Sequence, residues 1–517
     1  MSVVLFIIAF ACVVLYLARR AHAFWNKPLP PGPVALPIVG NLLVLLRSEP
    51  PWKIMKGLSD KYGNVFSLQL GPQVAIVLCD HVAIRDAFVK QAPCFSGRPY
   101  VYSISQFSRN NCGIAFGNIS PEWSYHKKLA SIAIHTNIHS NNKHDTATST
   151  EEKILEEIAH LVEVLKTKKD TPVDISQDLC LSVINVICHM TFNQRYQLND
   201  PEFQTILRDN RQFIDLLTPG DPVDIFPILK MFPNKRLRLI EELVTRRDEL
   251  FQKKFRDHLS TFDPNNIRDI TDSLLKAMQD CDDNGNTLNE DMILMTMWEI
   301  FTGGFQTISE TLKWAYAYLI SNPEVQENIC LEMKRIIGDR PLRWTDKPCL
   351  PYLNATILEI LRCSSVSSMN APHCTTHDTT YRGYNIPKDT MVMCNLWWVH
   401  HDPKYWKEPF KFEPDNNVCK QYATPPTANM ICLSEHTGRF LNEEGEVIIP
   451  QSFLPFSTGR RMCLGEQLAK MQMFLFVGCL VQSFRFQEVP GESYPDLEPE
   501  SGMFRLVKPY KTVISKR

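Results

Sequence analysis

One cysteine of the chain stands in a loop whose residue types suit a thiolate. Residues 456–465 read FSTGRRMCLG, with Cys463 between two glycines. The glycines would let the backbone approach a flat cofactor closely, while Arg460 and Arg461 would favour the ionised thiol. An apolar segment typical of a helix follows directly, and the positive end of its dipole would stabilise the same negative charge. Cys463 is therefore a candidate metal ligand; the alternative is a buried structural cysteine beside a chance pair of arginines.

The same ten residues resemble the heme-binding loop of the cytochrome P-450 superfamily. The family pattern Phe-x-x-Gly-x-Arg-x-Cys-x-Gly matches at Phe456, Gly459, Arg461, Cys463 and Gly465. The resemblance implies that Cys463 is the axial thiolate ligand of a heme b (iron-protoporphyrin IX).

Two further motifs extend the resemblance. Glu359 and Arg362 match the family's Glu-x-x-Arg pair, and Phe412-Glu413-Pro414 matches the start of its meander. In the family these parts form a buried ion-pair network that holds the heme loop. An isolated pair with this spacing would instead be a surface salt bridge.

The resemblance covers almost the whole chain and is strongest towards the microsomal class, which includes drug-metabolising and steroid-hydroxylating enzymes. The motifs that carry it are FSGRP at 95–99, GIAF at 113–116 and APH at 371–373. The residues that it implies as contacts of the heme propionates are Arg98, Trp123, Lys127, His373 and Arg461. Lys127 stands where the family usually has arginine, so it keeps the charge and loses the bidentate fork.

The candidate oxygen-activation segment is Gly303-Gly304-Phe305-Gln306-Thr307. Two glycines beside a threonine can open a groove in a helix for dioxygen and water, and the Thr307 hydroxyl can relay protons. The family has an acid where this chain has Gln306. Because an amide has no titrating proton, delivery must run through Thr307 and ordered water. A purely structural role for this segment is the alternative.

The pattern along the chain predicts a mainly helical fold with a small β portion, the cytochrome P-450 fold. Apolar periodicity predicts helices over Met292–Ile320, Leu353–Arg362 and Gln467–Phe484. Residues 66–79 predict a β-hairpin around Gly71-Pro72, and Thr380–Ile386 and Thr390–Leu396 read as short strands.

The N-terminus predicts one transmembrane helix ahead of this body. Val3–Ala18 is an uninterrupted apolar run that Arg19 and Arg20 close, and a basic flank on that side stays in the cytosol. A signal peptide cleaved after residues 21–23 is the alternative. We therefore expect a membrane anchor at 1–20, a proline-rich hinge at 21–41 and a heme-thiolate catalytic domain at 42–517. The protein would be a single-pass protein of the endoplasmic reticulum membrane with a cytosolic catalytic domain.

A polar segment interrupts the expected meander. Removing residues 416–438 would join Asp415 to Arg439 and restore the family's continuation. The segment is rich in Pro and Thr and lacks periodicity, so we expect an inserted loop that hinders heme loading or docking of the electron donor.

The resemblance implies a monooxygenase that inserts one atom of O2 into a lipophilic substrate. Electrons would come from NADPH through an NADPH–cytochrome reductase, with cytochrome b5 as a second candidate partner. The net charge of -2 gives no reason to expect nucleic acid as a partner. Residues 220–235 resemble the branch of steroid 17-hydroxylases and aryl-hydrocarbon hydroxylases, in which Asn210 and Arg246 would be polar substrate contacts. The alternatives are a heme-thiolate isomerase or peroxygenase and a catalytically impaired heme-binding isoform.

Overall fold

The chain folds into a body that is mostly helical. The computed structural model describes residues 29–45, 49–139, 149–217, 222–232, 234–279, 285, 287–414, 439–500 and 502–517. The longer helices are α3 (Pro51–Tyr62), α7 (Pro121–His139), α8 (Thr150–Thr167), α9 (Ser176–Phe192), α10 (Pro201–Leu216), α12 (Lys235–Ser260), α13 (Ile270–Gln279), α14 (Glu290–Ser321), α15 (Pro323–Ile337), α16 (Pro351–Ser364) and α19 (Glu466–Ser483). The shorter helices are α2 (Leu42–Leu45), α4 (His81–Arg85), α5 (Ala92–Phe95), α6 (Tyr102–Phe107), α11 (Pro222–Ile225) and α17 (Leu396–His401). A π-helical turn spans Asp86–Lys90, and 3-10 turns span Pro227–Met231, Trp344–Cys349 and Gly459–Arg461.

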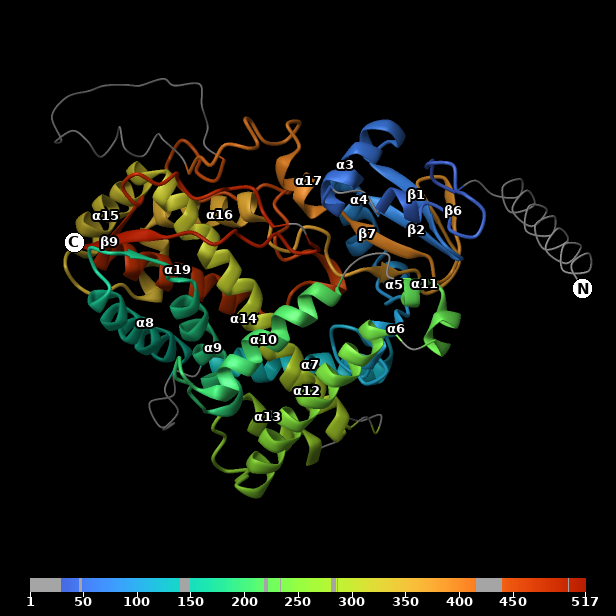
Figure 1. Ribbon diagram of the computed structural model, residues 1–517, viewed down its shortest axis with the longest axis horizontal. Helices are drawn as coiled ribbons and strands as arrows, with labels where there is room; N and C mark the ends of the chain where they lie inside the picture. Colours follow the sequence, from blue (N-terminus) through green and yellow to red (C-terminus); the bar gives the residue numbers. More distant parts are fainter. Residues whose placement is uncertain are drawn as a thin grey trace, which may run out of the picture.

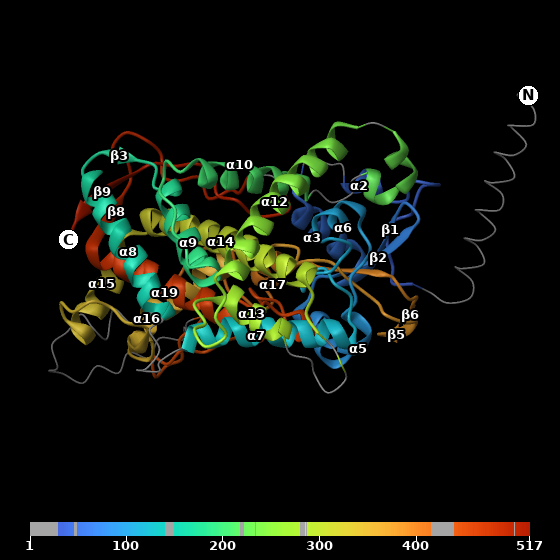
Figure 2. The same ribbon diagram turned by 90° about the horizontal axis from the view of Figure 1, so that it is seen from below.

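The β portion is small and lies mainly at two ends of the molecule. One sheet has the order β1-β2-β7-β4, with β1 (Val65–Leu70), β2 (Gln73–Leu78), β7 (Met391–Cys394) and β4 (His373–Cys374). A second has the order β3-β9-β8, with β3 (Pro172–Val173), β9 (Thr512–Lys516) and β8 (Phe484–Gln487), and a third pairs β5 (Thr379–Tyr381) with β6 (Tyr384–Ile386). The first sheet lies at one end with α3, while α8, α15 and β9 lie at the other (Figures 1 and 2).

Helix α14 runs through the middle of the body, and its ends follow from its sequence. The Asn289 side chain accepts the Met292 N–H, two acids occupy the first turn, and Pro323 begins the next helix. The predicted helix over Met292–Ile320 is thus confirmed and is one or two residues longer at each end.

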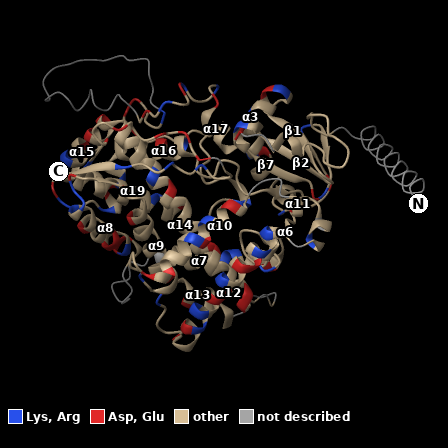
Figure 3. Cartoon of the chain, viewed as in Figure 1, with Lys and Arg blue, Asp and Glu red and all other residues tan. Residues whose placement is uncertain are grey.

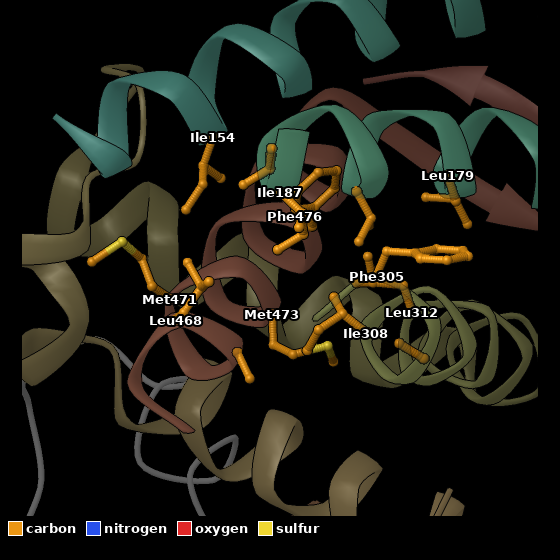
Figure 4. Close-up of a cluster of buried hydrophobic side chains, with 14 of the residues drawn as sticks. Ile154, Leu179, Ile187, Phe305, Ile308, Leu312, Leu468, Met471, Met473 and Phe476 are labelled. Atoms are coloured by element: carbon orange, nitrogen blue, oxygen red, sulfur yellow. The ribbon is translucent and has the colours of Figure 1, made fainter. Parts of the chain in front are cut away.

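The main hydrophobic core lies between α14, α19, α8 and α9. Apolar side chains from all four helices converge there (Figure 4). Both α14 and α19 are apolar on nearly every side, as expected for helices enclosed by other elements. Lys, Arg, Asp and Glu lie instead on the outer helices such as α8, α12 and α13, with both signs interspersed (Figure 3).

Two predictions for the β portion have different outcomes. The hairpin over residues 66–79 is confirmed, since β1 and β2 pair antiparallel from Val65↔Leu78 to Leu70↔Gln73. The single strand over Thr380–Ile386 is wrong: β5 and β6 fold back on each other. Arg382 and Gly383 both have positive φ, which produces a tight turn between them.

The described part of the proline-rich segment packs against the first sheet. Ser67 donates from its backbone N–H to Pro31 O at 2.8 Å, and the Asn41 side chain accepts the Gln69 N–H at 2.8 Å. The predicted membrane anchor at 1–20 and the predicted insertion at 416–438 lie outside the described residues. Among the helices that the structure describes, none is long and apolar enough to cross a bilayer.

Candidate active site

Cys463 lies in a tight loop directly before α19. Its backbone N–H donates to Phe456 O at 3.1 Å, and a 3-10 turn over Gly459–Arg461 precedes it. Of the cysteines that the structure describes, only Cys349 and Cys463 are exposed. Protein atoms nevertheless surround the Cys463 thiol closely enough that burial raises its pKa, and the Gly465 backbone N–H opposes this rise. The thiol is thus recessed and open on one side, which suits a metal ligand.

Two details of the loop differ from the sequence-based expectation. Gly459 has φ +81°, and an added Cβ would lie 2.0 Å from Phe88 O. Both the backbone conformation and the packing on the π-helical turn therefore require glycine here. Arg461 donates to Ser96 O, Ile114 O and Gly117 O at 3.0, 3.0 and 2.6 Å. Burial, the Gly465 N–H and the Glu466 charge shift the Cys463 pKa, and the expectation that the two arginines promote the thiolate stays a prediction.

Arg98 is buried and Arg461 is half-buried, and the nearby acid Glu299 acts on both charges without forming an ion pair with either. Arg98 donates only to carbonyl oxygens, those of Ala115, Ala371 and Pro372. Neither guanidinium has a described carboxylate within 4.0 Å. Burial lowers the pKa of Arg98 to about 10, and burial together with the Arg98 charge lowers that of Arg461 to about 9.

His373 adds a free polar atom beside these arginines. Its Nδ1 bonds with Phe95 O at 2.8 Å, while its Nε2 is buried without a hydrogen-bond partner. Burial and the Arg98 charge lower its pKa well below the ordinary value, so the ring is neutral. Two cations without an ion-pair partner and a ring nitrogen without a hydrogen-bond partner, among the described residues, match a cofactor that brings two carboxylates. The residues present therefore fit the propionates of a heme.

Trp123 and Lys127, the other two predicted propionate contacts, lie in the same cluster, and each donates a hydrogen bond to a backbone carbonyl oxygen. The Arg461 guanidinium stacks 4.0 Å above the Trp123 ring, and the Trp123 N–H donates to Ile114 O at 3.0 Å. Lys127 donates to Arg460 O and lies 5.5 Å from the Trp123 ring centre. Trp123 and Lys127 thus support Arg461 and its loop in this structure.

The Glu359–Arg362 pair forms a fully buried network. Arg362 donates to both Glu359 oxygens at 2.7 and 2.9 Å, and both side chains are 0% exposed. Arg439 and the Glu413 N–H reach the same carboxylate. The pair is therefore a buried hub and not the surface salt bridge that was the alternative. Arg439 makes this contact with residues 416–438 present in the chain, and the expectation that the segment hinders heme loading stays a prediction.

His400 connects this hub to the heme-loop side. Arg362 donates to His400 O at 2.7 Å, and His400 Nε2 accepts the Leu454 N–H at 2.9 Å. Burial and the Arg362 charge lower the pKa of His400 to about 3, so the ring is neutral. Because Nε2 accepts, the proton must lie on Nδ1, which bonds with Ser365 Oγ at 2.8 Å.

The two glycines of the α14 segment have different neighbours. A Cβ on Gly303 would meet nothing within 4 Å, whereas one on Gly304 would lie 2.9 Å from the Ile187 side chain. Only Gly303 therefore faces open space, and Gly304 lets α9 approach. The Thr307 hydroxyl donates to Gly303 O at 2.8 Å.

Asn210 and Arg246 line a cavity of about 340 Å³ between α6, α10, α12 and α14. Both already have protein partners. Asn210 Nδ2 donates to Gln306 Oε1 at 2.5 Å, and Arg246 binds both Asp209 oxygens at 2.8 and 3.1 Å. The rest of the lining is mostly apolar and aromatic, and includes Phe213 and Trp298.

Sequence reasoning missed Glu299 of α14. This buried carboxylate accepts the Ile114 and Ala115 N–H groups at 2.7 and 3.0 Å, and burial raises its pKa to about 7. A Cβ on Gly113 would lie 2.1 Å from Glu299 Oε1, which explains the glycine of the GIAF motif. The available signal was a lone acid within an apolar helical run.

Comparisons with known proteins agree with this geometry. A model of the cytochrome P450 family matches residues 30–421 and 436–514. A steroid 17-alpha-hydroxylase/17,20 lyase of Rana dybowskii is 35% identical over 513 residues, which cover 97% of this chain and 92% of the relative. A cytochrome P450 1A1 of Sparus aurata is 36% identical over 510 residues, which cover 95% and 93%. The chain therefore belongs to the cytochrome P450 family and is a heme-thiolate monooxygenase that receives NADPH-derived electrons through a reductase.

Proposed function

We propose that Cys463 is the axial ligand of the heme and that Arg98, Arg461 and His373 hold its propionates. The observation that carries this assignment is the pair of guanidiniums that form no ion pair with a described carboxylate, one of them two residues from the cysteine. When bound, the heme supplies the activation of O2 for insertion of one oxygen atom into a C–H bond. The protein's own residues orient the substrate, exclude water and supply protons.

A steroid-like lipophilic molecule with one polar group is the proposed substrate. The relatives include a steroid 17-alpha-hydroxylase/17,20 lyase and a cytochrome P450 1A1. The aromatic cavity suits an apolar ring system, and Asn210 Nδ2 lies in it as a donor that a keto oxygen could take over from Gln306. A planar aromatic hydrocarbon would use the same apolar walls and would leave the Asn210–Gln306 bond intact.

The proposed setting is the endoplasmic reticulum membrane, with residues 1–20 as a single anchor and 21–41 as the connection to a cytosolic body at 42–517. The apolar run of residues 3–18 with arginines behind it supports the anchor. We propose cytochrome b5 as a second electron donor beside the reductase. The gap in the family match at 422–435 supports an insertion at 416–438.

One reconstitution tests the assignment. The protein would be combined with reductase, NADPH and a keto-steroid, and the carbon-monoxide difference spectrum of the reduced protein would be recorded. We expect Cys463→Ala to lose the thiolate signature and product formation together. Cys349→Ala changes the other exposed cysteine and should alter neither. A thiolate spectrum that survives in Cys463→Ala would refute the ligand assignment. Turnover of a planar aromatic hydrocarbon but not of the keto-steroid would refute the proposed steroid-like substrate.

A further inference from the structure

The Gln306 side chain is already hydrogen-bonded within the protein, and its amide is chemically unsuitable for carrying a proton. Gln306 is an amide, and its Oε1 accepts the Asn210 Nδ2–H at 2.5 Å. The residue before Thr307 thus ties α14 to α10. A titratable group that serves Thr307 must lie elsewhere.

Glu310 lies one helical turn beyond Gln306 on the same face of α14. Its side chain is buried, with 5% of its surface exposed. Oε1 accepts from Lys313 Nζ at 2.8 Å, whereas the buried Oε2 has no hydrogen-bond partner among the described residues. A buried carboxylate oxygen that remains unpaired is costly, so its presence on this helix requires an explanation.

The charged groups around Glu310 lead from the helix towards solvent. Lys313 lies on its own helix, Cys180 on α9, and Tyr510 just before β9. From α10, Arg211 acts on Glu310 and binds Glu500 at 2.9 Å. The Arg211 side chain is 54% exposed, so the charge that acts on Glu310 from α10 is in contact with solvent.

The spacing along α14 also favours contact with Thr307. Residues three apart on a helix have Cβ atoms about 5–6 Å apart, which one water molecule can bridge. The Thr307 hydroxyl already bonds to Gly303 O, beside the open space at Gly303.

We propose that Glu310 is the proton-relay residue of this enzyme and replaces the acid that position 306 lacks. Its Oε2 takes a proton from solvent on the Arg211 side and passes it through water to the Thr307 hydroxyl. Each proton that leaves Oε2 is replaced by one from solvent, so the carboxylate returns unchanged. Per turnover, substrate, O2, NADPH and one H+ give hydroxylated product, water and NADP+. Glu310 acts on the reaction only through Thr307 and does not itself contact the substrate or the heme. The proposal rests on the monooxygenase reaction.

The test compares wild type, Glu310→Gln and the double variant Gln306→Glu/Glu310→Gln, which moves the acid back by one turn. Glu310→Gln should lower turnover by about 100-fold, lower the yield of product per NADPH, change the solvent isotope effect, and leave substrate affinity and the carbon-monoxide spectrum unchanged. The double variant should recover most of the turnover. Glu332→Gln, which alters a buried glutamate that caps α16, controls for loss of a buried charge.

A second readout does not depend on turnover. The infrared difference spectrum between wild type and Glu310→Gln should contain the band of one buried carboxyl group. The proposal is overturned if Glu310→Gln retains turnover within twofold, or if the double variant folds and restores nothing. If Glu310→Gln does not fold, Gln306→Glu alone decides: a changed isotope effect supports a relay on this face, and an unchanged one refutes it. If the wild-type protein shows the infrared band but no turnover, the proposed monooxygenase reaction is refuted, whereas the assignment of the band to Glu310 is not.

Discussion

At the scale of single residues, Glu359 is the buried carboxylate that pairs with two guanidiniums at once. Its two oxygens take two bonds from Arg362, one from Arg439 and one from the Glu413 N–H. Glu359→Gln would leave two guanidiniums without their counter-charge and would turn an amide N–H2 towards one of them. We expect a loss of about 3–5 kcal/mol in the free energy of unfolding and reduced heme content, measured by denaturant titration and absorbance.

The control is Glu413→Gln, which keeps the backbone N–H on Glu359. The Glu413 side chain forms an ion pair with the half-exposed Lys411 at 3.2 Å, and the loss of such a pair should cost less than about 1 kcal/mol. Equal effects from the two variants would contradict a special role for the buried hub.

At the scale of elements, the meander keeps its contacts around the inserted segment. Arg439 donates to Lys407 O, Glu408 O and Lys411 O at 2.6, 2.8 and 2.9 Å, and Phe440 is buried. The two flanks of residues 416–438 therefore already lie side by side. A longer connection between these flanks adds little to the free-energy cost of folding, because closure entropy rises slowly with loop length.

Deletion of residues 416–438 should therefore leave heme content and the carbon-monoxide spectrum unchanged. Cleavage by added protease should slow, because a long polar loop would be gone. Heme content, spectrum and turnover of the deleted and full-length chains would be compared at equal protein concentration. A clear gain in heme content on deletion would restore the original expectation that the segment hinders loading.

At the scale of the whole molecule, two sets of buried groups oppose each other as pH falls. Burial lowers the pKa of His126 to about 4 and of His400 to about 3, and those of His373 and His401 fall well below 6.5. These histidines stabilise the fold above pH 6.5, and that contribution is lost as the pH falls. Burial raises the pKa of Glu299 and Glu332 from 4.5 to about 7. As the pH falls from 7 to 4.5, the folded state therefore binds more protons at these two groups and gains stability.

Four histidines outnumber two glutamates, so stability should decline moderately between pH 6.5 and 4.5, where the glutamates offset part of the loss, and fall more steeply below about pH 4.5. Below that value the glutamates are protonated in both states, whereas the unfolded chain still binds more protons at the histidines. Thermal unfolding at several pH values measures this profile. His126→Gln, which can still bond to Thr296, should reduce the loss at low pH. A uniform decline from pH 7 downwards would contradict the opposing sets.

The sequence by itself determined the local parts of this enzyme. The cysteine loop spans ten consecutive residues, Glu359 and Arg362 are three apart on one helix, and Asn289 and Pro323 bound α14. Such features depend on covalent neighbours and helical spacing, which a single sequence contains.

Only the tertiary structure decided which distant groups meet. Asn210 bonds to Gln306, 96 residues away, and Arg461 turns to carbonyls more than 300 residues earlier instead of towards the thiol. Glu299 lies beneath residues 114 and 115, and Glu310 has one oxygen without a partner. These outcomes depend on how helices and loops pack, because burial and the nearest charge decide whether a side chain is paired, neutral or free to react.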